Sequence, residues 1–256
     1  MHRHHDSIRW HLQVIARLLF VPFAFLVAPL LSFAQDEPPA KIRILLIGDS
    51  TVASYPNPPA DKPDLTGWGQ VFGEYFTDKV EVINHAKSGR SSKSFIREGL
   101  WAKALEVKAD YVFIQFGHND QKGKPAATEA DGEFRDNLKR YIAEARERGM
   151  KPILVTPVAR RTFAEGRAVS TLGPYADAMK VVGEATKTPV MDLHASSVAL
   201  YDKLGDEASA DYTAAATDRT HFSRRGALAM AKLVVEALRE QVPELKPVMV
   251  SSDAAK

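Results

Sequence analysis

The chain has 256 residues, of which 45% are hydrophobic and 26% charged, and it contains no cysteine. This composition predicts an ordinary globular protein with a sizeable core, and the lack of thiols excludes disulfide scaffolds, thiolate nucleophiles, cysteine-type zinc sites and iron–sulfur clusters. The formal net charge of +2 arises in residues 1–34, which hold three arginines and one aspartate, so the remainder is formally neutral. We therefore expect no nucleic-acid partner, because nucleic-acid binding needs a clearly basic surface.

Residues 1–34 have the pattern of a secretory signal peptide. A basic, histidine-rich start leads into the apolar run Leu18 to Leu31, and Ser32-Phe33-Ala34 places small residues where signal peptidase requires them. The alternative is a membrane anchor, which needs roughly 20 apolar residues to cross the hydrocarbon core, whereas this shorter run carries Pro22 and Pro29. We predict cleavage after Ala34, export to a periplasm or the medium, and no membrane contact after cleavage.

After a linker at residues 35–40, short apolar segments alternate with amphipathic ones. The apolar segments are nearly continuous in apolar character, as in strands buried on both faces: Lys41 to Ile47, Val80 to Asn84, Tyr111 to Phe116, Pro152 to Thr156 and Pro189 to Asp192. The helical candidates are Gly67 to Thr77, Ser94 to Leu105, Glu133 to Arg148, Pro174 to Lys187 and Ser223 to Gln241. Ser223 is expected to cap the last of these helices, and Pro243 to stop it.

Repeated strand and helix alternation predicts a parallel sheet with right-handed crossovers and helices on both faces. We expect one α/β domain at residues 41–245, a three-layer α/β/α arrangement around a flavodoxin-like five-stranded parallel sheet, followed by a C-terminal tail at 246–256. The polar segment Asp202 to Ala216 is expected to be a loop that borders the site.

Polar residues and glycines follow the predicted strands. In a parallel sheet, ligands bind beyond the carboxyl ends of the strands. Three strands lead into the segments Gly48 to Thr51, Asn84 to Ser91 and Gly117 to Asp120, and a fourth segment, Asp218 to Ser223, precedes the last helix. Each has an ordinary structural explanation by itself, because serine and aspartate cap helices while glycine and asparagine form turns.

Together the four segments hold the residue types of a serine hydrolase. Ser50 would be the nucleophile, and His221 would take its proton while Asp218, three residues earlier, orients the imidazole. Gly89 would let a backbone N–H approach a substrate oxygen, and Asn119 carries a neutral amide donor that can hold developing negative charge. These residues at one sheet edge predict a hydrolytic serine site.

The four segments resemble the four blocks of the SGNH (GDSL-type) hydrolases, in the same order and across the whole mature domain. A finer set of motifs is similar to rhamnogalacturonan acetylesterases, which remove acetyl groups from the pectin backbone: Gly48-Asp49-Ser50-Thr51-Val52, Gly67-Trp68-Gly69, Asn84-His85-Ala86, Gly89-Arg90-Ser91, Phe116-Gly117-His118-Asn119-Asp120, Thr156-Pro157, Arg160-Arg161 and Thr220-His221-Phe222. The resemblance implies Ser50 as nucleophile, His221 as base and Asp218 as its orienting group. It also implies an oxyanion hole made by the N–H groups of Ser50 and Gly89 and the side chain of Asn119.

We therefore expect a monomeric, secreted or periplasmic serine esterase that removes O-acetyl groups from a polysaccharide, with pectic rhamnogalacturonan as the expected substrate. The reaction would pass through an acetyl-enzyme and use neither a cofactor nor a metal. Four residues are candidates for substrate binding. Trp68 would be a sugar platform or a core residue, and Arg90, Arg160 and Arg161 would bind galacturonate carboxylates or brace loops. His85 and His118 are expected to have structural roles.

Three alternative functions stay open. A lipase or thioesterase of the same superfamily would need a long apolar acyl channel. A metal-dependent phosphoesterase would use oxygen and nitrogen ligands, for which the candidates are Asp49, Asn119, Asp120, Asp218 and His221. A non-catalytic glycan-binding protein would have no use for the full set of catalytic residue types.

Overall fold

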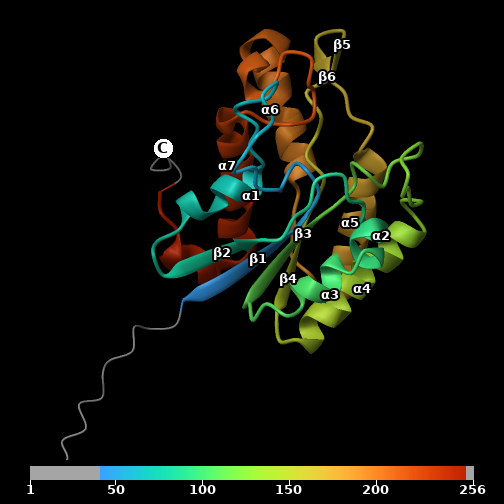
Figure 1. The fold of residues 1–256 in the computed structure, drawn as a ribbon, viewed down its shortest axis with the longest axis vertical. Coiled ribbons are helices and arrows are strands. Elements are labelled where there is room, and N and C mark those ends of the chain that lie inside the picture. The colour runs from blue at the N-terminus through green and yellow to red at the C-terminus, as the bar shows by residue number, and fades with distance from the viewer. Residues whose placement is uncertain (1–40, 252–256) are drawn as a thin grey trace, which may run out of the picture. The chain divides into compact units, whose positions relative to one another are not determined.

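The computed structural model describes residues 41–251, drawn as a ribbon in Figure 1. In chain order the elements are β1 (Ile42–Gly48), α1 (Trp68–Val71), η1 (Phe72–Tyr75), β2 (Val80–Asn84), α2 (Ser92–Arg97), α3 (Leu100–Ala104), β3 (Tyr111–Gln115), α4 (Glu133–Glu147), β4 (Lys151–Val155), β5 (Phe163–Ala164), β6 (Arg167–Ala168), α5 (Gly173–Thr186), β7 (Val190–Met191), α6 (Leu193–Ala208), η2 (Ala210–Tyr212), α7 (Arg224–Gln241) and η3 (Pro243–Val248). All five predicted strands are present, each within two residues of its predicted ends.

The main sheet has five parallel strands in the order β2-β1-β3-β4-β7. This is the flavodoxin-like order, with β1 beside β3 at the point where the direction of winding reverses. The predicted fold is confirmed. Leu46 near the end of β1 pairs with Asn84 at the end of β2, and Gly48 pairs with Gln115 at the end of β3, so the segments that follow these strands start at the same edge.

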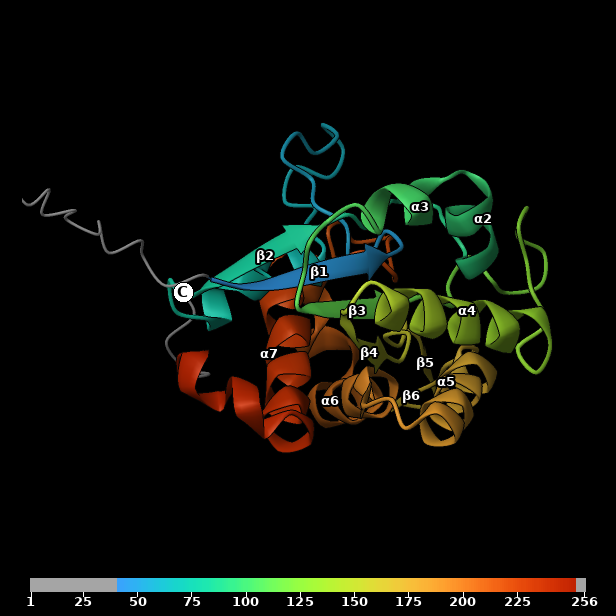
Figure 2. The same cartoon turned by 90° about the horizontal axis from the view of Figure 1, so that it is seen from below.

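Helices cover both faces of the sheet (Figures 1 and 2). Successive strand residues point to opposite faces, so Ile44 and Leu46 enter the core formed with α1, α6 and α7, whereas Leu45 and Ile47 enter the core formed with α2 to α5. All four side chains are completely buried. Burying such side chains on both faces is the main favourable term in folding, and it explains the nearly continuous apolar character of the strands.

One predicted helix is two helices in the structure. The predicted helix from Ser94 to Leu105 is divided at Gly99, whose φ of +73° lies in the left-handed region. Glycine adopts this conformation without the steric penalty of a Cβ, so α2 ends before it and α3 begins after it. The helix predicted to start at Ser223 is confirmed, because the Ser223 hydroxyl accepts the Gly226 N–H and α7 runs to Gln241.

The expectation of a loop at Asp202 to Ala216 is wrong for its first half, because α6 extends to Ala208. Its buried residues Leu193, Ser197 and Tyr201 are four apart, and the serine interrupts the apolar stripe that would have indicated a helix. The side chain of Asp192 caps the helix by accepting the Ala195 N–H, a start signal that was present in the sequence. The short β5–β6 hairpin was also not predicted.

The packed domain extends beyond its predicted end at residue 245. The chain continues in η3, Val248 and Met249 are largely buried, and Met249 forms a β-bridge with Phe76. Residues 246–250 are therefore part of the domain and not of a tail. The predicted signal peptide, the linker and residues 252–256 lie outside the described residues.

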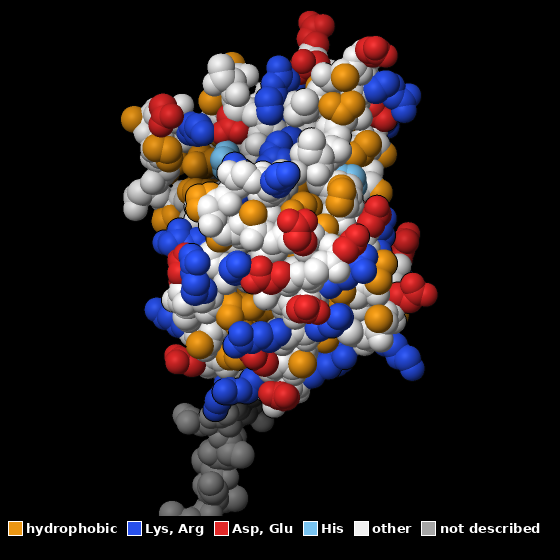
Figure 3. Space-filling view, turned by 90° about the vertical axis from the view of Figure 1, so that its right-hand side faces the viewer, with side chains coloured by type: hydrophobic (Ala, Val, Ile, Leu, Met, Phe, Trp, Pro, Cys, Tyr) orange, Lys and Arg blue, Asp and Glu red, His pale blue; other side chains and the backbone are white. Residues whose placement is uncertain are grey.

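The surface in Figure 3, which is the right-hand side of Figure 1, mixes basic and acidic side chains without a wide patch of one sign. Such mixing is typical of a solvated surface. Among the helices within residues 41–251, none has the length and apolar character to cross a bilayer.

Candidate active site

The fold brings the predicted site segments together at the carboxyl edge of the sheet. Ser50 follows β1, Gly89 follows β2 and Asn119 follows β3. The segment with Asp218 and His221 reaches the same edge through a backbone bridge, in which Thr66 N–H donates to Phe222 O at 2.9 Å. This bridge joins the loop after Ser50 to the segment that carries the histidine.

Ser50, His221 and Asp218 form a hydrogen-bonded chain. His221 Nε2 lies 3.0 Å from Ser50 Oγ, and His221 Nδ1 lies 2.8 Å from Asp218 Oδ2. These distances are within reach for proton transfer from the hydroxyl to the imidazole. The order of serine, imidazole and carboxylate is that of a nucleophile, a base and the group that orients the base.

The environment of Asp218 keeps its carboxylate ionised. Burial opposes its charge, but Lys62 and the backbone N–H groups of His221 and Thr220 hold the pKa of Asp218 well below its ordinary value. Both N–H groups donate to Oδ1, at 2.9 and 2.8 Å, while Oδ2 faces the imidazole. An anionic Asp218 can orient His221 and stabilise its protonated form.

A buried polar network lies beneath Ser50. Asp49, which is completely buried, accepts the N–H and hydroxyl of Thr51, and its other oxygen lies 3.2 Å from His118 Nδ1. Gln115 Nε2 donates to the Thr51 hydroxyl at 2.6 Å. Burial favours the neutral form of Asp49, but His118 and Thr51 together hold the pKa of this carboxyl below its ordinary value. This network fixes the turn from which Ser50 projects, and it gives His118 the structural partner that was expected.

The predicted oxyanion donors Gly89 and Asn119 line one cavity of about 290 Å³. Gly89 has a φ of +79° and open space where a Cβ would be, so the left-handed backbone conformation is what favours glycine there. Asn119 Nδ2 donates to Arg90 O at 3.1 Å, which orients the amide. An amide nitrogen has two hydrogens, so a second N–H is available for an anionic oxygen.

Two of the four candidate substrate-binding residues are buried. Trp68 is completely buried, and its Nε1 donates to Gln115 Oε1 at 2.9 Å, so the sugar-platform interpretation is wrong and Trp68 is a core residue. Arg161 is 3% exposed and pairs with Asp206, so it braces the end of α6. A guanidinium at this depth and with this partner is not available to a polymeric substrate.

The other two candidates stay near the site. Arg90 lines the cavity with Gly89 and Asn119, although Glu98 and the Ser88 carbonyl already accept hydrogen bonds from it. Arg160 is half-buried, and it donates to Gln121 Oε1 at 2.7 Å and to the hydroxyl of Thr220, next to His221. Both guanidiniums therefore have protein partners and also lie beside the candidate site.

Two further cations lie among these residues and were not predicted from the sequence. Lys62 Nζ lies 2.6 Å from Asp218 Oδ2, and Arg97 lines the cavity of Gly89 and Asn119. Lys62 belongs to a long loop whose path cannot be deduced from periodicity. Arg97 is the last residue of α2, the short helix that follows the Gly89 segment, and no sequence pattern singled it out.

The alternative metal-ligand set is not assembled. Asp120 accepts hydrogen bonds from Ser92 and Thr128, whereas Asp218 binds Lys62 and His221. Within residues 41–251, no three histidine, aspartate or glutamate side chains lie together as candidate metal ligands.

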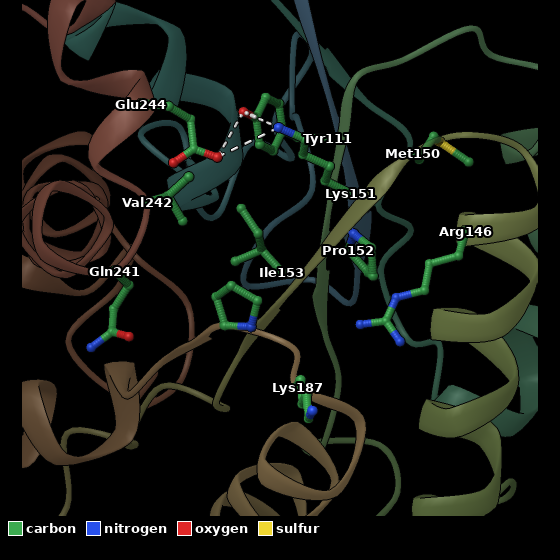
Figure 4. Close-up of a pocket in the computed structure, with 11 residues that line it drawn as sticks. Tyr111, Arg146, Met150, Lys151, Pro152, Ile153, Lys187, Gln241, Val242 and Glu244 are labelled. Carbon is green, nitrogen blue, oxygen red and sulfur yellow. Dashed lines mark hydrogen bonds and ion pairs between the residues drawn. The ribbon is translucent and has the colours of Figure 1, made fainter.

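A cavity of about 270 Å³ lies at the opposite, amino-terminal edge of the sheet (Figure 4). Tyr111 and Lys151 at the starts of β3 and β4 line it, and Lys151 contacts both Tyr111 and Glu244. Among the described residues, the lining of this cavity includes no serine, histidine or aspartate. The residues of the predicted serine site lie instead at the carboxyl edge.

Comparison with known proteins places the chain in a family of hydrolases. The GDSL-like Lipase/Acylhydrolase family model matches residues 46–229. The rhamnogalacturonan acetylesterase RhgT of Bacillus subtilis is 42% identical over 83% of this chain and 96% of its own length. The probable rhamnogalacturonan acetylesterase YesY of the same organism is 39% identical over 77% of this chain and 93% of its own length.

A solved structure shares the fold. The crystal structure of the Bacillus subtilis protein YxiM superposes with a TM-score of 0.70 and 30% identity, and the match covers 80% of this chain and 58% of that one. The family match includes Ser50, Gly89, Asn119, Asp218 and His221 within its span. The chain therefore belongs to the GDSL-like lipase/acylhydrolase family, and it is a carboxylic ester hydrolase.

Proposed function

We propose that this protein is a serine esterase that removes O-acetyl groups from a pectic polysaccharide, rhamnogalacturonan, through an acetyl-enzyme. The observation that carries the proposal is the Ser50–His221–Asp218 chain, with contacts of 3.0 and 2.8 Å. Gly89 and Asn119 follow the neighbouring strands β2 and β3 at the same sheet edge and line a cavity together. Two relatives whose names specify rhamnogalacturonan acetylesterase, matched over more than nine-tenths of their length, support the substrate class.

The proposed reaction has two halves. Ser50 Oγ attacks the acetyl carbonyl while its proton passes to His221 Nε2, and Asp218 stabilises the imidazolium. The N–H groups of Ser50 and Gly89 and the Asn119 amide hold the oxyanion. The C–O bond to the sugar then breaks, and the sugar oxygen leaves with the proton from His221. Water repeats these steps on the acetyl-enzyme, releasing acetate and restoring the Ser50 hydroxyl.

The character of the cavity favours a sugar over a lipid. Besides Gly89 and Asn119, its lining holds the polar or charged side chains of Arg90, Ser94, Arg97 and Glu98. A lipase or thioesterase would instead need an apolar channel for a long acyl chain. Arg90, Arg97 and Arg160 are proposed to meet carboxylates of the galacturonate residues, because a guanidinium can pair with a carboxylate in a bidentate fork.

The location and state of the enzyme are also part of the proposal. Residues 1–34 have the pattern of a cleaved signal peptide, and a polysaccharide substrate is found outside the cytoplasm. We propose that the mature enzyme acts as a monomer in a periplasm or in the medium, without a cofactor.

The test is acetate release from three substrates: acetylated rhamnogalacturonan, acetylated xylan and a synthetic aryl acetate. We expect the highest kcat/KM on acetylated rhamnogalacturonan and no release by the Ser50→Ala variant. Preference for long-chain acyl esters would favour the lipase alternative. Equal rates on both polysaccharides would contradict rhamnogalacturonan as the preferred substrate but would still support an esterase.

A further inference from the structure

The carboxylate of Asp218 has a second charged partner besides the imidazole. Lys62 Nζ lies 2.6 Å from Asp218 Oδ2, the same oxygen that lies 2.8 Å from His221 Nδ1. The other oxygen, Oδ1, accepts the backbone N–H groups of Thr220 and His221. One carboxylate oxygen is thus shared between an ammonium group and the candidate base.

The contact between Lys62 and Asp218 is partly shielded from water. The Asp218 side chain is 9% exposed and that of Lys62 is 28% exposed. Ion pairs on open surfaces contribute little to stability, because water and salt screen them. Here one partner is nearly buried, so a change in the charge of Lys62 acts on Asp218, and through it on His221, with less screening.

The backbone around Lys62 places it beside this segment. Lys62 N–H donates to Pro59 O at 2.9 Å, and Lys62 O accepts Leu65 N–H at 3.1 Å, so a turn precedes the residue and another follows it. The bridge from Thr66 to Phe222 then anchors the loop next to His221. In Figure 2 the loop between β1 and α1 projects above β1 and β2. Lys62 is therefore held near Asp218 by main-chain contacts as well as by its own charge.

Other charged or titratable groups surround the imidazole, but they contact it less directly. Arg160 reaches the neighbouring Thr220 hydroxyl, and the Tyr55 hydroxyl donates to Ser50 O at 2.8 Å. Asp61 adjoins Lys62, and the Asp49–His118 pair lies beneath Ser50. Among residues 41–251, Lys62 is the cation whose side chain donates a hydrogen bond to Asp218, the carboxylate that faces His221.

We propose that Lys62 is a positioning residue: by sharing Asp218 Oδ2 with His221 Nδ1, it holds the carboxylate in place and disfavours premature protonation of the imidazole. The proposal rests on the serine-esterase mechanism proposed above. An ammonium group offsets part of the negative charge that stabilises an imidazolium, and it also repels the imidazolium directly. Both effects disfavour the imidazolium relative to the same site without the Lys62 charge.

Lys62 keeps its charge throughout the working range. Its hydrogen bond with Asp218 raises the pKa of Lys62 above the ordinary value, so the ammonium persists from about pH 5 to pH 9. The effect on His221 is therefore constant across this range, and it should appear as a displacement of the acid limb of the pH profile.

The test measures kcat and KM on an uncharged aryl acetate between about pH 5 and pH 9, so that the substrate itself does not titrate. Lys62→Met removes the charge and the donor, Lys62→Gln removes the charge but keeps a donor, and Lys62→Arg keeps both. Lys79→Met, which removes an exposed lysine just before β2 at the opposite sheet edge, is the matched control.

We expect the acid limb of the pH profile of kcat/KM to move to higher pH by about half to one unit in Lys62→Met and Lys62→Gln. Side-chain pKa values in folded proteins typically vary by about this much. It should stay in place in Lys62→Arg and in the control. On the plateau, Lys62→Met should lower kcat by more than Lys62→Gln does and leave KM nearly unchanged, because the donor also positions Asp218. A histidine titration followed by NMR in the Ser50→Ala background should show the same displacement for His221.

An acid limb that stays in place in both uncharged variants would overturn the proposal, as would a uniform loss explained by a lower melting temperature. If Lys62→Met does not fold, the pH profile of Lys62→Gln and the NMR titration of His221 still test whether the Lys62 charge displaces the acid limb. The outcome is separable from the proposed function: full activity of Ser50→Ala, or a wild-type profile without an acid limb, would contradict the serine mechanism whatever Lys62 does.

Discussion

His221 Nε2 lies 3.0 Å from Ser50 Oγ, although 171 residues separate them in the chain. The turn that carries Ser50 is held by the buried hydrogen bonds of Asp49 to Thr51. His221 is held by its contact with Asp218 and by the backbone bridge between Thr66 and Phe222. The two side chains are therefore held by different contacts, and the bridge links the segments that carry them at one sheet edge. Because the two side chains are already positioned, their ordering does not add to the activation free energy of the proposed reaction.

Replacing the proposed nucleophile should abolish turnover. We expect Ser50→Ala to lower kcat by roughly three orders of magnitude or more and to leave the fold intact. His221→Ala should be about as inactive, and Asp218→Ala less so, because a misoriented imidazole can still act. Kinetics and circular dichroism of the three variants, with mass-spectrometric mapping of a fluorophosphonate to Ser50, check this. Near-normal turnover in Ser50→Ala would refute the mechanism.

Removal of the Asn119 amide tests the oxyanion hole. Loss of one such donor typically lowers kcat by about 10²- to 10³-fold, and we expect Asn119→Ala to behave in this way with little change in KM. The measurement is steady-state kinetics on the aryl acetate. A rise in KM alone would instead make Asn119 a substrate-binding or structural residue.

The ionisation of Asp218 should contribute to stability in a pH-dependent way. Its folded-state pKa is held below the ordinary value of 3.8, so its stabilising contribution is complete above that value and is lost as the pH falls through the folded-state pKa. We expect Asp218→Asn, in a His221→Ala background that removes the imidazole, to lower the free energy of unfolding by a constant amount between about pH 5 and pH 8. The difference should shrink below about pH 4. Urea unfolding at several pH values measures it, and a difference that stays constant down to pH 3 would show that Asp218 is not preferentially ionised in the folded state.

Chelation separates the serine mechanism from the metal-dependent alternative. A serine esterase holds its oxyanion with fixed N–H donors, so we expect no change in kcat/KM after exhaustive treatment with a chelator. Activity that disappears and returns with one divalent ion would support the phosphoesterase alternative. Assays on an aryl acetate and an aryl phosphate with the same preparation make the comparison direct.

The arginines at the site should affect a charged substrate selectively. We expect Arg90→Gln, Arg97→Gln and Arg160→Gln to raise KM for acetylated pectin while barely changing kinetics on the aryl acetate. The effect should weaken with salt, because exposed charges are screened over about 8 Å at physiological ionic strength. Arg161→Gln should instead lower the melting temperature, since that residue is buried against Asp206.

The exposed Arg148 at the end of α4 provides the control for these variants. Its replacement by glutamine removes one positive charge away from the cavity and should leave both substrates unaffected. Parallel losses on pectin and aryl acetate in the site variants would mean that these arginines brace loops and do not recognise carboxylates.

The sequence by itself determined the fold class and the residues that the fold brings to one edge. Each strand buries both faces, so its apolar character is continuous and local, and the order of strands and helices leaves few topologies. Ser50 could be selected because the carboxyl ends of parallel strands lie together whatever the details of the loops. Asp218 and His221 could be selected because an aspartate three residues before a histidine, placed just before the last helix, resembles the fourth block of the SGNH hydrolases. Hydrophobic periodicity did not predict two features. The left-handed backbone at Gly99 separates α2 from α3, and the buried Ser197 interrupts the apolar stripe of α6.

Only the tertiary structure decided which polar side chains are accessible and which charges meet. Trp68 and Arg161 stand in suitable motifs, yet both are buried, because exposure depends on what packs over a residue and not on its neighbours in the chain. Lys62 contacts Asp218 from 156 residues away, through a loop anchored at Phe222. A loop of this kind carries no periodic signal, so its contacts depend on the packing of the whole domain, and the charge balance at the candidate base could be seen only after the chain was folded.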